Sequence, residues 1–145
     1  MHRKEKAVEL FKQQFNCSQA VFTAYRKTDV LDEENALKLS TVLGAGIACT
    51  GTETCGAVSG GLLAISMHYG RGDVESIDAK VKTYELGKRF MTDFQSHMGS
   101  CTCESILGLN IGVPENLEKA KEMKLFETRC VDAVKKASDL LDEIL

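Results

Sequence analysis

The fold is decided by residues 55–69, which read CGAVSGGLLAISMHY. This segment is apolar on nearly every side of a helix, and such a helix belongs in the middle of a bundle. Gly56 and Gly60 lie four residues apart on one face, next to Ala57. Because these residues are so small, another backbone or a ligand can approach the face closely. We therefore expect a central glycine- and alanine-rich helix, with Gly56, Ala57 and Gly60 as candidate cofactor-binding residues.

Helices are predicted on both sides of this segment. Apolar residues recur at helical spacing, and Asn16 and Asp32 are suited to cap helix starts. Besides 55–69, helices are expected over 3–14, 17–26, 32–43, 74–97 and 103–107, from Pro114 onward, and over 126–145. The residues expected to face inward include Leu39, Ile77, Val81, Tyr84, Met91 and Phe94. Nothing alternates with period two, so we expect an all-α fold: a compact bundle of about five to seven helices forming a single domain over residues 1–145.

Composition and charge exclude several classes of protein. Of the 145 residues, 43% are hydrophobic and 27% charged, which is ordinary for a globular domain. The net charge is -3 and no block of lysine and arginine stands out, so we expect no nucleic-acid partner. The longest apolar stretch, residues 57–67, is too short for membrane insertion. Residues 1–14 lack the apolar run of a secretory signal, and we expect a cytoplasmic protein.

The chain holds six cysteines, which are Cys17, Cys49, Cys55, Cys101, Cys103 and Cys130. Cytosolic thiols are kept reduced, so clustered cysteines there more often bind metal or do redox chemistry than staple the fold. The alternative is that each cysteine is simply a small, buried apolar residue with no chemical role.

Three cysteines, Cys17, Cys55 and Cys103, stand at predicted helix starts. The partly positive end of a helix lowers the pKa of a thiol and favours the thiolate, the form that attacks and that binds metal. Cys130 lies instead on the inner face of the last predicted helix. We expect these four cysteines to converge on one redox or metal site. Cys49, in a glycine-rich loop predicted from Gly44 onward, is a candidate spare ligand or resolving thiol.

Other motifs are absent from the sequence. The glycines of residues 51–61 have no lysine where a phosphate-binding loop needs one, and no dinucleotide fingerprint or Ser-His-Asp set is visible. The pair Cys101 and Cys103 does not have the C-x-x-C spacing of thioredoxin-like proteins.

Four motifs resemble a known family. They are NCSQAV at 16–21, TCGAVSG at 54–60, GSCTCESILG at 99–108, and Cys130 near the end. Together they resemble the C_GCAxxG_C_C family, whose members are described as redox-active proteins of about this length. The resemblance covers nearly the whole chain, and its most specific part is the middle motif, which reads Cys-Gly where the family label has Gly-Cys.

The resemblance implies a set of site residues. The signature cysteines correspond to Cys17, Cys55, Cys103 and Cys130, with Cys103 preferred over Cys101 because the third signature cysteine opens a C-x-x-[LI]-L-G segment. Cys49 and Cys101 are then additions. The family also resembles the N-terminal part of split-Soret cytochromes c, which carry haems and a proposed iron–sulfur cluster and which assemble as dimers. This implies a possible cluster and a possible homodimer, whereas the absence of C-x-x-C-H excludes covalent c-type haem.

Three functions remain open from the sequence. In the first, the four thiolates hold a [2Fe–2S] cluster or another metal for electron transfer or redox sensing. In the second, the protein is a cofactor-free thiol–disulfide protein, with Cys55 as the attacking thiolate and Cys17 or Cys103 as its partner. In the third, the cysteines only pack in the core of a helical binding or dimerisation module. The redox partner is not identified by these residues, nor is it settled whether the protein is an enzyme.

Overall fold

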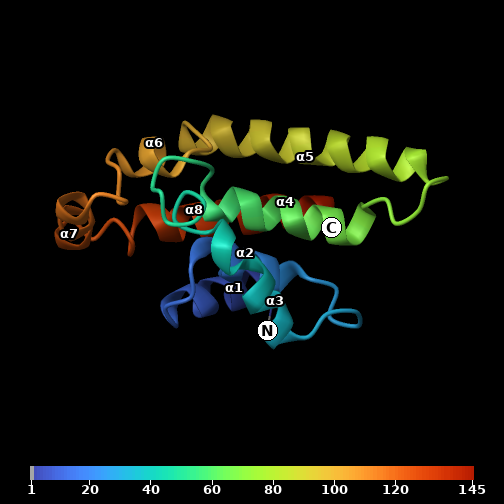
Figure 1. Ribbon diagram of the computed structural model, residues 1–145, viewed down its shortest axis with the longest axis horizontal. Coiled ribbons are helices and arrows are strands. Elements are labelled where there is room, and N and C mark those ends of the chain that lie inside the picture. Colours follow the sequence, from blue (N-terminus) through green and yellow to red (C-terminus); the bar gives the residue numbers. More distant parts are fainter. Residues whose placement is uncertain (1) are drawn as a thin grey trace.

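The computed structural model describes residues 2–145, and across these residues it contains helices and no β-strand (Figure 1). The helices are α1 (Arg3–Lys12), α2 (Cys17–Tyr25), α3 (Glu33–Ser40), α4 (Gly56–Tyr69), α5 (Ile77–Met98), α6 (Cys103–Leu107), α7 (Pro114–Glu122) and α8 (Arg129–Ile144), with a 3-10 turn η1 (Thr41–Leu43). The predicted all-α bundle is confirmed, and the described residues contain eight α-helices, one more than the upper end of the expected five to seven.

Helix α4 is the central helix, as predicted. It runs between α5 on one side and the α1–α3 group on the other (Figure 1), and it contacts α2, α5 and α8. Its glycines allow close packing: a Cβ atom built on Gly60 would lie 2.6 Å from the Ser18 carbonyl oxygen. The backbone of α2 therefore lies directly against α4. The small-residue face was expected to admit either another backbone or a ligand, and here it admits a backbone.

Side-chain caps fix where α2, α3 and α6 begin, and those at Asn16 and Asp32 were predicted. The Asn16 side chain accepts a hydrogen bond from the Gln19 backbone N–H at 2.9 Å, and the Gln19 side chain accepts one from the Asn16 N–H at 3.0 Å. This capping box satisfies two backbone donors that have no partner within the helix. The Asp32 and Thr102 side chains cap α3 and α6 by accepting one hydrogen bond each, from the backbone N–H groups of Asn35 and Ser105. The caps before α2 and α6 leave Cys17 and Cys103 as the first residues of their helices.

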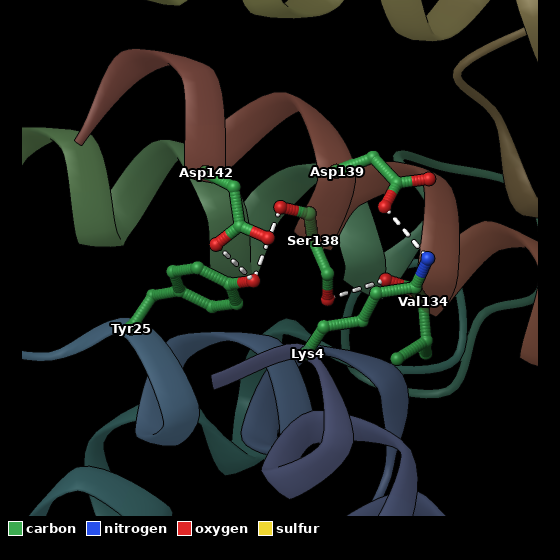
Figure 2. A network of polar contacts seen from close by, with 6 residues as sticks. All are labelled: Lys4, Tyr25, Val134, Ser138, Asp139 and Asp142. Carbon is green, nitrogen blue, oxygen red and sulfur yellow. Dashed lines mark hydrogen bonds and ion pairs between the residues drawn. The ribbon is translucent and has the colours of Figure 1, made fainter. Parts of the chain in front are cut away.

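Helices α1 and α2 are fastened to α8 by a polar network (Figure 2). Tyr25 is fully buried, and its hydroxyl lies 3.0 Å from the Ser138 carbonyl oxygen and 2.9 Å from Asp142 Oδ1. Lys4 pairs with Asp139 at 2.7 Å. The buried phenol needs such partners because an unpaired hydroxyl is costly in the core.

Several predicted helix boundaries were wrong by a few residues. Helix α5 begins at Ile77 instead of residue 74, because the Asp73 side chain accepts hydrogen bonds from the Glu75 and Ser76 N–H groups and holds a turn there. The segment predicted as a helix over 32–43 ends as a 3-10 turn. Helix α1 stops at Lys12, and α8 starts at Arg129 after a series of turns.

The predicted inner face of α5 was also wrong. Four residues expected to face inward are exposed, namely Ile77, Val81, Tyr84 and Met91. Helix α5 instead buries Phe90, Phe94 and Met98. The Phe90 ring sits where Gly61 of α4 leaves room, which sets the rotation of α5 about its axis. Leu39 on α3 is exposed as well, whereas Phe94 is buried as expected.

None of the helices in residues 2–145 combines the length and the apolarity needed to cross a membrane.

Candidate thiol site

The four signature cysteines line one cavity of about 520 Å³. They are Cys17 on α2, Cys55 directly before α4, Cys103 on α6 and Cys130 on α8. Cys55, Cys103 and Cys130 are buried and Cys17 is half-buried. The structure thus brings together the residues that the sequence singled out, although they are far apart along the chain.

A short pairing of two segments places Cys55 and Cys103. Thr54 and Thr102 form an isolated antiparallel bridge. The Cys55 N–H donates to the Cys101 carbonyl at 2.7 Å, and the Cys103 N–H donates to the Glu53 carbonyl at 2.9 Å. The starts of α4 and α6 are therefore held side by side by backbone hydrogen bonds.

Arg129 places the first turn of α8 beside α6. Its guanidinium donates to the carbonyl oxygens of Ile106 at 3.0 Å and Met98 at 3.3 Å. Cys130 follows directly and points inward, as the periodicity predicted, so that its thiol reaches the cavity from the α8 side.

Cys55 is the thiol most suited to be a thiolate. A hydrogen bond from the Cys17 thiol lowers the pKa of Cys55, and the Ala57 and Val58 backbone N–H groups at the start of α4 lower it further against the opposing effect of burial. Hydrogen bonds to Cys130 and Cys55 raise the pKa of Cys17, and burial adds to this. Cys17 therefore keeps its proton and donates it, while Cys55 accepts.

Cys103 lies in the same cavity but remains a thiol. Burial raises its pKa to about 12, and the negative charge of a nearby Cys55 or Cys130 thiolate adds to the effect. The two further cysteines do not line the cavity. Cys101 is half-buried and donates from its Sγ to the Met91 carbonyl at 3.5 Å, and Cys49 is exposed.

The thiols of the cavity do not form a metal site as they are arranged. Within the part of the chain that the structure describes, no three or more His, Cys, Asp or Glu side chains form a group able to hold a metal ion. Four thiols are the right number and chemistry for a cluster or zinc site, but as arranged they do not make a closed coordination shell.

The small-residue face contributes one residue to the cavity. Gly56 lines it, and a Cβ there would lie 2.9 Å from the Cys17 Cβ. Gly60 lies against Ser18, and Ala57 is buried in the core. The absence of a side chain at Gly56 is therefore what allows Cys17 to approach the start of α4.

A left-handed turn over residues 45–49 contributes one residue, Ala45, to the lining of the cavity. Four residues other than glycine have positive φ there, with φ of 52° at Ala45, 67° at Ile47, 53° at Ala48 and 60° at Cys49. Such a conformation costs on the order of 1–2 kcal/mol per residue. Hydrogen bonds hold it, including one from the Gly51 N–H to the Ala45 carbonyl at 2.9 Å. Ala45 lines the cavity.

The remaining walls of the cavity were not predicted from the sequence. They are apolar, formed by Phe11, Phe15, Leu107, Ile111 and Phe126 among others. Phe11 and Phe15 have the helical spacing of ordinary core residues. A periodic pattern marks residues that avoid water, and it does not distinguish a core from the wall of a cavity.

An all-helical domain with clustered thiols around one cavity defines a protein whose chemistry is carried by cysteine. The family model described as "Putative redox-active protein (C_GCAxxG_C_C)" matches residues 15–144, and the chain belongs to this family. The family description supports a redox role. No curated protein and no solved structure matches the chain.

Proposed function

We propose that the protein is a cofactor-free thiol–disulfide redox protein in which Cys55 is the attacking thiolate and Cys17 the resolving thiol. One observation carries this proposal: Cys55 is the N-cap residue of α4 and lines the cavity together with Cys17, and the Cys17 thiol and the backbone N–H groups of Ala57 and Val58 lower its pKa. A thiol whose ionised form accepts hydrogen bonds is more often a thiolate near neutral pH, which is the attacking species. The family description favours this over a helical module whose cysteines only pack.

The proposed reaction has two exchange steps. The Cys55 thiolate attacks one sulfur of a disulfide R–S–S–R′, so that the R–S–S–R′ bond breaks, a Cys55–S–S–R bond forms, and R′–S⁻ leaves. Cys17 then gives up its proton to the departed thiolate and attacks Cys55 Sγ, which releases R–S⁻. The substrate gains two electrons, and the protein is left with a Cys17–Cys55 disulfide. A cellular dithiol then reduces this disulfide and becomes oxidised itself.

A second candidate is a metal or iron–sulfur protein. The observation that favours it is that Cys17, Cys55, Cys103 and Cys130 all line one cavity. The resemblance to split-Soret cytochromes c, which stays a prediction, points the same way. We rank this candidate second, because the thiols as arranged do not form a group able to hold a metal within the described residues.

Metal analysis and alkylation of protein purified without oxygen distinguish the two candidate functions. We expect iron and acid-labile sulfide far below one equivalent, and Cys55 to be the first cysteine alkylated at pH 6, identified by mass spectrometry. With a disulfide substrate, Cys17→Ser is expected to accumulate a mixed disulfide on Cys55, whereas Cys55→Ser is expected to form none.

The matched control is Cys49→Ser, which removes an exposed thiol outside the cavity and should leave both results unchanged. Two irons and two sulfides per chain, lost in Cys130→Ser, would overturn the thiol–disulfide proposal and establish the cluster. Slow alkylation of all six cysteines at pH 6 would also count against it.

A further inference from the structure

We propose that the disulfide taken by Cys55 is a small aliphatic molecule that carries a carboxylate and enters the cavity, and not a disulfide presented by another protein. This inference rests on the proposed thiol–disulfide function and adds the class of substrate to it.

Access to the sulfur is the first argument. Cys55 is 6% exposed, and its neighbours Cys103 and Cys130 are 7% and 9% exposed. A protein disulfide must bring one sulfur into contact with the attacking thiolate while its own folded surface stays outside. At a cysteine buried among helix ends, only a slender molecule that enters the cavity reaches the sulfur.

The size and the walls of the cavity are the second argument. Its volume of about 520 Å³ falls in the range of small-molecule sites. The apolar side chains of Phe11, Phe15 and Phe126 form much of its wall. Such a wall favours an aliphatic chain over the peptide groups of a polar disulfide, because buried amides without partners cost free energy.

Charge at the edge is the third argument. The charged side chains that border the cavity are Lys12, Lys121 and Glu127, all exposed. Lys121 lies 3.5 Å from Glu118, whereas none of the ion pairs found across residues 2–145 involves Lys12. With Lys121 paired to Glu118, Lys12 is the lysine at this edge that takes part in none of those ion pairs, and it is the partner we expect for an anionic group at the outer end of the ligand.

The simplest probe with these features is lipoate, a cyclic disulfide on a four-carbon chain that ends in a carboxylate. Attack by Cys55 opens its ring, and the leaving thiolate stays on the same molecule. Cys17 then displaces the second sulfur, so that the probe leaves as a dithiol and the protein holds the Cys17–Cys55 disulfide. The reference probe is hydroxyethyl disulfide, which is small, polar and uncharged.

The experiment measures single-turnover rate constants of the reduced protein with each probe in excess. We expect lipoate to react at least about tenfold faster than hydroxyethyl disulfide after correction for their rates with a free thiol, and octanoate to inhibit the lipoate reaction. Lys12→Gln should slow lipoate about two- to fivefold, as expected for one partly exposed ion pair, and leave hydroxyethyl disulfide unchanged. Lys82→Gln, which removes an exposed lysine of α5 outside the cavity, should change neither rate.

The outcomes distinguish the two proposals. If hydroxyethyl disulfide reacts at Cys55 but lipoate has no advantage and octanoate does not inhibit, the inference about the substrate fails and the proposed function stands. If neither disulfide reacts at Cys55, the proposed function fails. A faster reaction with an oxidised thioredoxin-type protein than with lipoate would also overturn the inference.

Discussion

Replacement of Gly60 by alanine tests whether α2 and α4 pack backbone against backbone. A Cβ at this position would lie 2.6 Å from the Ser18 carbonyl oxygen, 2.9 Å from its Cα and 3.1 Å from its carbonyl carbon. All three are backbone atoms, so no side-chain rotation relieves the clash, and the two helices must move apart. Overpacking of a core lowers the free energy of unfolding by about 1–3 kcal/mol, and the higher helix propensity of alanine offsets up to about 1 kcal/mol of this loss. We expect a net loss of about 1–2 kcal/mol in the free energy of unfolding.

The assay is urea denaturation followed by circular dichroism, with Gly87→Ala as the matched control. Gly87 also lies inside a helix, but the nearest atom to its added Cβ is the Leu62 Cδ2 at 3.3 Å, the end of a flexible side chain. Gly87→Ala should be as stable as the unchanged protein or more stable. If Gly60→Ala is as stable as Gly87→Ala, the close packing of α2 on α4 is refuted.

Three further predictions concern the turn at 45–49, the Cys103 thiol and the Tyr25 hydroxyl. Ala48→Gly should stabilise the protein by about 1 kcal/mol, because Ala48 is exposed and has a φ of +53°. The control Ala79→Gly, inside α5, should destabilise it by a similar amount. Thermal melts in which both variants shift the melting temperature in the same direction would contradict this. Stability should fall as the pH rises from about 8.5 toward 12, because the unfolded chain ionises Cys103 near the ordinary thiol value while burial raises the folded pKa to about 12. This stabilising effect is complete below the pKa of the unfolded chain. Between pH 8 and pH 10.5, the free energy of unfolding measured by urea titration should fall less in Cys103→Ala than in the unchanged protein. An equal fall in the two proteins would count against this explanation. Tyr25→Phe should cost about 1–2 kcal/mol in chemical denaturation through its lost contacts with α8, and an unchanged midpoint would show that the network in Figure 2 contributes little.

The features that local chemistry controls were predicted from the sequence. The capping box at Asn16, the cap at Asp32 and the uniformly apolar helix over 55–69 depend on residues close together in the chain, and all three are present. The position of Cys17 at a helix start follows from the Asn16 cap, and that of Cys103 follows from the cap at Thr102. Local rules of this kind hold because they satisfy backbone groups that every helix end leaves unpaired.

The features that depend on tertiary contacts were not predictable. Helix α5 carries apolar residues on more than one face, and the space above Gly61 selects Phe90 over Ile77 and Tyr84. The left-handed turn at 45–49 had no signal, because alanine and isoleucine are not the residues that usually adopt positive φ. The distribution of hydrogen bonds among the cysteine thiols also arises only once α2, α4 and α8 have packed.

The proposed function depends on Cys55 being a thiolate, with its pKa lowered by the Cys17 thiol and by the backbone N–H groups at the start of α4. The most direct measurement is the pH dependence of Cys55 alkylation, read by mass spectrometry in the unchanged protein and in Cys17→Ala. We expect half-maximal reactivity below the ordinary thiol pKa of about 8.5 in the unchanged protein, and a shift to higher pH when the Cys17 thiol is removed. A Cys55 that titrates at or above that value, or one whose titration is the same without Cys17, would contradict it.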